Sequence, residues 1–420
     1  MWLARTLVLA AIAISLAIAN PMLGYNSWND GSRMATASAL VEHGTFAIDR
    51  TSFVNTGDKI FVGGHFYSDK PPLPSIMAAA VYLPLYHLGL ELSHGRNKAY
   101  YVIVVLTMKG VLLLALFCFY FALKRTGLSD GTRILLTGAL ALSSLLLPWT
   151  AVFNNHGLAA GFVTVGLYSI IEARHRDNAR ALVLVAGLFF SLASVCDLST
   201  GAIFAAFGML VIATKKLRPY AVWYFLPCLV TFVPYLTFNY LISGSVLPVQ
   251  LNEQLFMYPG SPWIDFLALS GVRANDLGTA LHIAWLYLFG PNGFVLYNPL
   301  LFVAIPLTVR EVWRRGPFWR EALATLGASG VIFVFYVATT TNESGASYSI
   351  RWFVPLLPLL LFFLYPFFET LTKLRAVAFA ALATASLVIA GIGVVDPWSE
   401  QNTYESAFLY NLGKVFDSNG

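Results

Sequence analysis

The residues best suited to chemistry lie in a short polar stretch of an otherwise apolar chain. This stretch reads GGHFYSDKPPLPS and places Asp69 and Lys70 directly before two consecutive prolines, Pro71 and Pro72. A proline fixes its own backbone angle and restricts the residue before it, so we expect Lys70 to be held at a defined position. A lysine ammonium group held in this way is suited to binding a phosphate.

An acidic residue stands earlier in the same region. Asp30 begins the sequence DGS, a typical helix start, and Gly44 is a typical helix stop, so we expect a short helix between them. Its apolar side chains share one face, which predicts that the helix lies on a membrane surface; they are Met34, Ala37, Leu40 and Val41. A carboxylate at such a helix end acts either as a cap or as a base, and both roles stay open at this point.

A hairpin is predicted to position Lys70. The pair Gly63-Gly64 separates two β-prone triplets in DKIFVGGHFYS, which is a typical hairpin signal. The second strand of this hairpin leads directly into Ser68, Asp69 and Lys70. The hairpin would therefore present the lysine at one fixed place in the loop.

The apolar composition of the chain predicts the helices that position these residues. The 420 residues are 58% hydrophobic and 11% charged, whereas soluble domains carry about 25% charged residues. Apolar stretches of about 18 to 25 residues recur along the chain and predict membrane-spanning helices. Clear apolar cores are Leu7–Ala19, Tyr101–Leu123, Ile134–Trp149 and Ala376–Val395. The chain is therefore predicted to be an all-α polytopic membrane protein with a single membrane domain over residues 1–420.

The positive charges orient this predicted membrane domain. The net charge of +5 does not indicate nucleic-acid binding, because the basic residues form short clusters between apolar runs instead of one basic surface. Such clusters in short loops typically lie on the cytoplasmic side. They are Lys124, Arg125 and Arg133; Arg174, Arg176 and Arg180; Lys215, Lys216 and Arg218; Arg310, Arg314, Arg315 and Arg320; and Lys373 and Arg375. The scattered cysteines Cys118, Cys196 and Cys228 form neither a disulfide framework nor a metal motif.

Placing these clusters and the N-terminus in the cytoplasm gives about eleven spans. The predicted spans cover roughly residues 4–23, 99–123, 134–152, 157–173, 181–197, 200–214, 219–242, 295–309, 321–340, 352–369 and 376–395. Residues 24–98 then form a long first outer loop, residues 243–294 form a second long outer segment, and the chain ends outside. The proline-rich segment 71–92 is expected to lie as a helix in the outer membrane interface, because a crossing there would move the first basic cluster outside.

At this point the sequence resembles a known family. An aspartate early in the first outer loop, a short surface helix and then SDKPPLPS are similar to the GT-C superfamily of membrane glycosyltransferases, and most to its branch of the bacterial aminoarabinose transferase and the protein O-mannosyltransferases. The matching positions are Asp30 and Lys70-Pro71-Pro72-Leu73, and the likeness in topology covers residues 1–240. The chain departs where relatives often carry a second acid in the next outer loop. It has Asn154-Asn155-His156 there, and an acid appears in the following outer turn, at Asp197.

The resemblance implies an enzyme: an inverting glycosyltransferase that moves a sugar from a polyprenyl-phosphate-linked donor to an acceptor at the outer face of the membrane. Asp30 would be the general base for the attacking hydroxyl group. Lys70 and then Arg351 would hold the phosphate of the leaving lipid. The further donor-binding candidates are Arg33, Arg96 and Lys98, and the candidates for sugar or acceptor binding are His65, Tyr67, Asp69, Asn155, His156, Asp197 and Glu343.

The same resemblance sets the expected partners and location. The partners are the lipid-linked donor, a lipid, glycan or protein acceptor, and membrane lipids, but no nucleic acid. The location is a bacterial or archaeal cytoplasmic membrane with the active site on its outer side. No cofactor is expected, and His65, Asp69 and His156 do not have the spacing of a metal site.

A transporter or lipid flippase is the main alternative. Lys109 and Asp197 are ionisable residues within or near predicted spans, as is common in transporters. The sequence shows neither an inverted repeat nor paired broken helices, which many transporters carry. A transferase of phosphoethanolamine or acyl groups would need a nucleophile or a metal cluster that the sequence does not display. Transport should survive the change Asp30→Asn, whereas glycosyl transfer should not.

Overall fold

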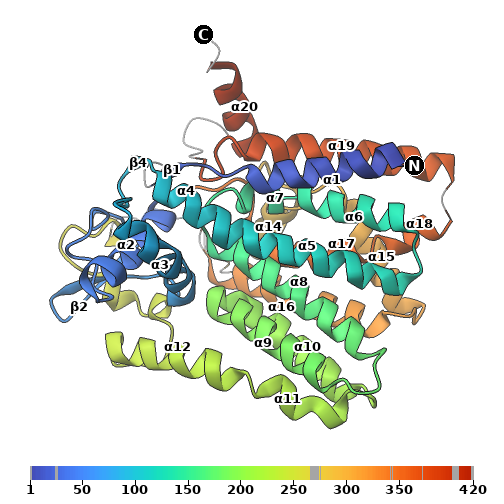
Figure 1. The fold of residues 1–420 in the computed structure, drawn as a ribbon, viewed down its shortest axis with the longest axis horizontal. Helices are drawn as coiled ribbons and strands as arrows, with labels where there is room; N and C mark the ends of the chain where they lie inside the picture. Colours follow the sequence, from blue (N-terminus) through green and yellow to red (C-terminus); the bar gives the residue numbers. More distant parts are fainter. Residues whose placement is uncertain are drawn as a thin grey trace.

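The protein is a bundle of helices with a small layer of other elements at one end, where α2 (Trp28–His43), β2 (Lys59–Val62) and α3 (Pro72–His87) lie beside the bundle (Figure 1). The structure is a computed structural model, and it describes residues 2–23, 27–264, 274, 276–340, 342, 344–370, 372–399 and 406–417. Within these residues the only sheets are two pairs of short strands. The predicted all-α class is therefore confirmed.

The bundle is built from helices along the whole chain. Their order and bounds are α1 (Trp2–Ala17), α4 (Lys98–Val104), a π-helical turn (Val105–Lys109), α5 (Gly110–Leu123), α6 (Asp130–Leu142), α7 (Leu146–Trp149), α8 (Asn155–Ala173), α9 (Arg180–Cys196), η3 (Leu198–Thr200), α10 (Gly201–Ala213), α11 (Ala221–Phe225), α12 (Cys228–Ser243), α14 (Leu277–Phe289), α15 (Leu301–Trp313), α16 (Trp319–Thr339), η7 (Arg351–Leu356), α17 (Leu357–Phe362), α18 (Tyr365–Glu369), α19 (Lys373–Gly393) and α20 (Ala407–Asp417). The core of the bundle is apolar and continuous.

Six of the described helical stretches are long and apolar enough to cross a membrane. They are Lys98–Thr126, Asn155–Ala173, Arg218–Ser243, Trp319–Thr339, Arg351–Glu369 and Lys373–Gly393. Large apolar side chains on the outside of these helices, such as Leu113, Val230 and Val388, are exposed in the isolated chain, as expected for surfaces that face lipid. The protein is thus an integral multi-pass membrane protein, and the number of about eleven spans stays a prediction.

Several predicted helix bounds differ from the structure for local reasons. The first helix ends at Ala17 instead of residue 23, ahead of a proline. The predicted helix 134–152 is broken between α6 and α7, where the amide of Leu145 turns away to the side chain of Asn298. The helix predicted from residue 295 begins only at Leu301. The apolar helix α14 inside the second outer segment was not predicted.

The loops with basic clusters meet at one end of the bundle. The guanidinium of Arg125, after α5, lies 2.7 Å from Glu172 at the end of α8. The guanidinium of Arg174 lies 2.6 Å from Glu321 at the start of α16. These ion pairs bring the ends of α5 and α8 and the start of α16 together at one end of the bundle, and the side of the membrane on which this end lies stays a prediction.

The first outer loop contains the predicted hairpin. Strands β2 (Lys59–Val62) and β3 (His65–Ser68) pair antiparallel with Val62 opposite His65. The turn residues Gly63 and Gly64 have φ angles of 59° and 89°, a left-handed conformation that glycine adopts without strain. The glycine pair therefore fixes the register of the hairpin. After it comes α3 (Pro72–His87), the helix expected within the segment 71–92.

The helix predicted around Asp30 differs in its start and in its surroundings. It is α2 (Trp28–His43), its N-cap is Ser27, whose hydroxyl accepts a hydrogen bond from the amide of Asn29, and it ends at Gly44 as predicted. Residues 29–39 are buried, so the helix is enclosed by protein instead of lying on the membrane with one open face. The surface-helix prediction was wrong because the small residues of α2 pack closely on α3.

The topology is testable by labelling. In a variant whose three native cysteines are changed to alanine, Asn55→Cys, in an exposed part of the first outer loop, should react with an impermeant thiol reagent in intact cells. Arg176→Cys, in a basic loop and 64% exposed, should react only after the membrane is opened. The reverse pattern of labelling would show that the first outer loop faces the cytoplasm.

Candidate functional site

Asp30 is held at the start of α2 by two hydrogen bonds. Its Oδ1 accepts from the amide of Gly31 at 2.8 Å, and its Oδ2 accepts from the hydroxyl of Tyr100 at 3.1 Å. The same hydroxyl accepts from the amide of Phe153 at 3.0 Å. Burial raises the pKa of Asp30 to about 7, against the opposing effect of the Tyr100 hydroxyl. The carboxyl group can therefore take up and release a proton near neutral pH, which is the behaviour of a general base.

Lys70 lies between two carboxylates. Its Nζ is 2.8 Å from Oδ2 of Asp58 and 2.9 Å from Oδ2 of Asp69. Burial raises the pKa of Asp69 to about 6, with Lys70 opposing this shift. Asp58 was missed in the sequence, although the hairpin could have revealed it: β2 and β3 pair Lys59 with Ser68, so the preceding Asp58 must lie near Asp69.

The hairpin is attached to α2 through buried hydroxyl groups. The Ser32 hydroxyl donates to the carbonyl oxygen of Asp58 at 2.5 Å and lies 2.6 Å from the hydroxyl of Ser68. The Ser68 hydroxyl in turn accepts from the backbone amide of Lys70 at 3.2 Å. This chain of contacts fixes Lys70 relative to Asp30, two residues before Ser32, as the sequence pattern predicted for the lysine.

Arg33 joins the outer loop to the bundle. Its guanidinium donates to the backbone oxygen and the side-chain oxygen of Asn29, at 3.0 and 2.5 Å, and to Oδ1 of Asn155 at the start of α8, at 2.7 Å. The side chain is buried, and burial lowers the pKa of the guanidinium. Its Nε is a fully buried nitrogen without a partner among the described residues. Protein contacts thus engage both terminal nitrogens of Arg33, and its reserve role in donor binding stays a prediction.

His156 and Asp197 form a buried pair between α8 and α9. Nδ1 of His156 lies 2.6 Å from Oδ2 of Asp197, and Oδ1 of Asp197 accepts from the hydroxyl of Ser199 at 3.0 Å. The side chains of the pair are 6% and 4% exposed. Asn155, next to His156, approaches the same ring nitrogen at only 3.5 Å, a distance at which a hydrogen bond is weak. The sequence placed these residues in two different outer turns, and the fold brings them together.

Arg351, at the start of η7, is a cation whose N–H groups are mostly unpaired among the described residues. Among the described residues it makes one long hydrogen bond, from Nη1 to the oxygen of Ala346 at 3.5 Å, and its guanidinium lies 5.0 Å from the ring of Trp398. It forms no ion pair in the described part of the chain, although the negative charges of Asp58 and Asp197 interact with its positive charge over a longer range. Arg351 is half-buried, and its Nε is a fully buried donor without a partner among the described residues, so the guanidinium keeps unpaired N–H groups that an anion could satisfy.

These groups form what we call the charged cluster, which lies where the outer loop meets the helix ends. Electrostatic interactions connect Arg33 with Asp30, Asp58, Asp69 and Asp197, and connect Arg351 with Arg33 and His156. The cluster is made of Asp30, Arg33, Asp58, Asp69, Lys70, His156, Asp197 and Arg351. Seven of these residues were site candidates in the sequence analysis, and the structure adds Asp58 to them.

Other predicted site residues lie apart from the cluster. His65 is 59% exposed at the hairpin turn, where it lies 3.2 Å from Asp49. Arg96 and Lys98 are exposed near the start of α4. Tyr67 has its backbone paired with Ile60 and Ala47, and Glu343 lies outside the described residues.

The second outer segment closes over the hairpin beside the charged cluster. The side-chain amide of Gln250 donates to the carbonyl oxygen of Asp69, and the indole N–H of Trp263 donates to the carbonyl oxygen of Gly57 at 2.8 Å. The ring of Trp28, at the start of α2, covers Gly57 so closely that a Cβ atom there would overlap with it. Gly57 therefore lets the loop before Asp58 pack flat against α2.

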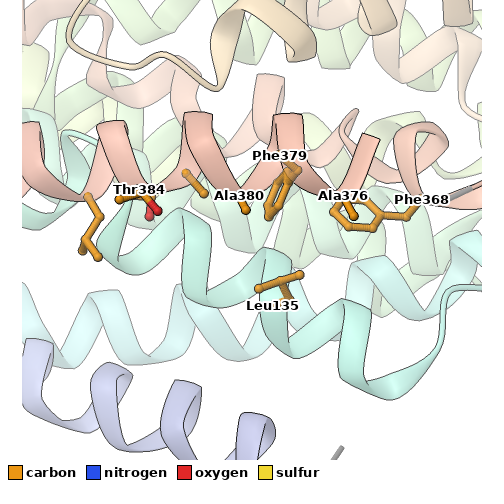
Figure 2. A pocket seen from close by; sticks show the side chains of 9 residues that line it. Leu135, Phe368, Ala376, Phe379, Ala380 and Thr384 are labelled. Atoms are coloured by element: carbon orange, nitrogen blue, oxygen red, sulfur yellow. The ribbon is translucent and has the colours of Figure 1, made fainter. Parts of the chain in front are cut away.

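A cavity of about 320 Å³ lies far from this cluster, between α6, α18 and α19 (Figure 2). Its lining side chains are apolar apart from Ser143 and Thr384, and none is ionisable. It begins beside the basic loop before α19, at the opposite end of the bundle, so it is not part of the candidate site. Within the described residues, no group of three or more His, Cys, Asp or Glu side chains is arranged to hold a metal ion.

No family model and no curated protein matches this chain. Solved structures match it in fold. ArnT from Cupriavidus metallidurans bound to undecaprenyl phosphate superposes with a TM-score of 0.56 at 15% identity, covering 94% of this chain and 64% of ArnT. The oligosaccharyltransferase of Archaeoglobus fulgidus in complex with Zn and sulfate gives a TM-score of 0.56 at 14% identity, covering 94% of this chain and 54% of the enzyme.

A further structure is AglB from Archaeoglobus fulgidus in complex with an inhibitory peptide and a dolichol-phosphate. It gives a TM-score of 0.52 at 13% identity, covering 96% of this chain and 57% of AglB. This chain therefore spans between about half and about two thirds of these structures. At such identities the likeness shows the fold alone, which this chain shares with ArnT, the oligosaccharyltransferase and AglB.

The packing of Trp28 on Gly57 gives a test of how the loop is held. Gly57→Ala should lower the thermal unfolding temperature in detergent, because the added methyl group overlaps the Trp28 ring and over-packing typically costs about 1–3 kcal/mol. Gly327→Ala is the matched control, since an added Cβ within α16 meets no atom within 4 Å. Equal unfolding temperatures for both variants would mean that the loop does not depend on this contact.

Proposed function

We propose that the protein is a membrane glycosyltransferase that moves a sugar, with inversion, from a polyprenyl-phosphate-linked donor to an acceptor at the outer face of the membrane. The observation that carries this proposal is the charged cluster, in which Asp30, Lys70 and Arg351 come together from distant parts of the chain. The cluster occurs in a fold shared with structures that hold undecaprenyl phosphate or a dolichol-phosphate. Membrane glycosyl transfer is the chemistry that such a carboxylate and such cations support.

In the proposed reaction Asp30 takes the proton of the acceptor hydroxyl group. The acceptor oxygen forms a bond to the sugar C1 atom while the bond from C1 to the phosphate oxygen breaks, and its electron pair stays on the phosphate. A single displacement inverts the configuration at C1, and a second carboxylate placed for a double displacement is not needed. The Tyr100 hydroxyl and the Gly31 amide orient Asp30 for this step.

In the proposed donor complex the phosphate binds to Arg351 and Lys70. Arg351 carries free N–H groups, so it binds the anion directly. Lys70 already contacts Asp58 and Asp69, so a phosphate at Lys70 must displace one of these carboxylates or share the lysine with it. Charge grows on the phosphate as the bond breaks, and both cations then stabilise the transition state more than the ground state.

A lipid flippase remains the second candidate. The ammonium group of Lys109, buried in the π-helical turn between α4 and α5, donates to the Thr150 hydroxyl at 3.0 Å, and buried ionisable groups within spans often mark transport paths. Glycosyl transfer is favoured because the carboxylate and the cations gather at one end of the bundle rather than along a path through it. If the protein is a flippase, the Asp30→Asn variant should move the lipid at the same rate as the wild type.

The proposed base gives a pH prediction. Asp30 must be ionised to act, so kcat/KM should fall tenfold per pH unit below about 7 and level off above it. Asp30→Asn should slow release of polyprenyl phosphate from a synthetic donor by about 10²- to 10⁴-fold while leaving donor affinity nearly unchanged. Glu91→Gln, an exposed acid in the same loop, is the control. Near-normal turnover by Asp30→Asn would reduce Asp30 to a structural role.

The two phosphate-binding cations should differ in a measurable way. Arg351→Ala should weaken donor affinity about 10- to 100-fold, the range for a lost charged hydrogen bond. Lys70→Ala should weaken it more, because Asp58 and Asp69 would then face the phosphate unpaired. The double variant Lys70→Ala with Asp58→Asn should recover part of that loss.

Exposed Arg50, which lies in the same loop, provides the control for these cations, and Arg50→Ala should bind the donor normally. The measurement is the affinity for a polyprenyl-phosphate sugar in detergent or nanodiscs. Unchanged affinity in both single variants would exclude the charged cluster as the phosphate site.

A further inference from the structure

The pair His156–Asp197 has an open hydrogen-bonding position that the proposed reaction does not use. Nδ1 of His156 lies 2.6 Å from Asp197, and because a carboxylate only accepts, this nitrogen carries the proton. In the neutral ring the lone pair is then on Nε2. Among the described residues Nε2 has no partner, and it is not one of the fully buried polar atoms that lack one, so part of its surface is accessible although the side chain is only 6% exposed.

The groups around this ring leave Nε2 as its open hydrogen-bonding atom. Both oxygens of Asp197 are engaged, one by His156 and one by Ser199. The carboxylate of Asp197 has the largest charge effect on the ring, and the guanidinium groups of Arg33 and Arg351 oppose it. A hydroxyl group, which donates one hydrogen bond and carries no charge, can satisfy Nε2 at this place.

We propose that Nε2 of His156 accepts a hydrogen bond from a hydroxyl group of the donor sugar. This inference rests on the proposed function and names a contact to its substrate. Arg351, assigned to the donor phosphate, is one of the groups close to His156, so a phosphate held by Arg351 brings its sugar to the histidine. Asp197 is then a positioning residue, because it sets the proton on Nδ1.

The test pairs deletions in the donor with a deletion in the protein. Donor affinity is measured for a panel of neutral sugars linked to a short prenyl phosphate, together with the mono-deoxy analogue at each hydroxyl. For the wild type, one deoxy analogue should bind roughly 10- to 100-fold more weakly, because it leaves Nε2 unpaired. His156→Ala should bind the parent sugar about as weakly as the wild type binds that analogue, and removing the hydroxyl should then have no further effect.

A control and a second variant separate this role from a structural one. His175→Ala changes the same residue type at the other end of α8 and should behave as the wild type. His156→Gln keeps an acceptor atom and should recover part of the preference for the hydroxyl. A purely structural His156 would weaken all donors by one factor and keep the deoxy penalty intact, which would overturn the inference.

Replacing the sensitive hydroxyl by a methoxy group tests the hydrogen bond in the wild type alone, whether or not the variants fold. The methoxy analogue has no proton to donate, so it should bind no more tightly than the deoxy analogue, and binding as tight as that of the parent sugar would overturn the inference. Failure of the proposed function has a different signature: the wild type would then bind none of the prenyl-phosphate sugars more tightly than the same prenyl alcohol.

Discussion

Burying charge in an apolar bundle is the constraint on which the rest of this structure depends. A charged side chain removed from water is stable only when it is paired or hydrogen-bonded. Arg33 meets this condition by bonding to Asn29 and Asn155, and in doing so it ties α2 to the start of α8. Lys70 meets it with Asp58 and Asp69. The outer loop is therefore fixed on the helix ends by the same contacts that make its charges tolerable.

The charged groups of the cluster are not all paired with opposite charges, and the unpaired groups can still transfer a proton or bind an anion. Two acids share Lys70, whereas the described contacts of the Asp30 carboxyl group include backbone amides and a hydroxyl group but no ion pair. Arg351 likewise has no acid partner among the described residues. A carboxyl group with a pKa near neutrality and a guanidinium with free N–H groups are the two components that a proton transfer coupled to a leaving phosphate requires.

The loop architecture follows from packing as much as from charge. The glycine pair at the hairpin turn sets the register, and that register brings Asp58 beside Asp69. Gly57 then allows Trp28 to lie against the loop, and the second outer segment holds both through Trp263 and Gln250. A change far from Asp30 can therefore alter the site by loosening these contacts, since small displacements of positioned groups lower rates strongly.

Several features of this protein follow from its sequence alone because they depend on local physics. Apolar runs of membrane length require helices, the glycine pair requires a hairpin, and the prolines after Lys70 stiffen its backbone. The family resemblance rested on Asp30 and the run that begins at Lys70, and solved structures share the fold of this chain. Each of these features is decided by residues close together in the chain.

Only the tertiary structure decided which polar groups meet. The pairing of β2 with β3 places Asp58 beside Asp69, next to Lys70. Arg33 links α2 to the start of α8. The helix α2 is enclosed by protein and does not lie on a surface. His156 and Asp197 lie 41 positions apart in the chain, and nothing in their spacing fixed a distance of 2.6 Å between them. Such contacts depend on how helix ends are placed by packing of the whole bundle, and that placement is not encoded in any short segment.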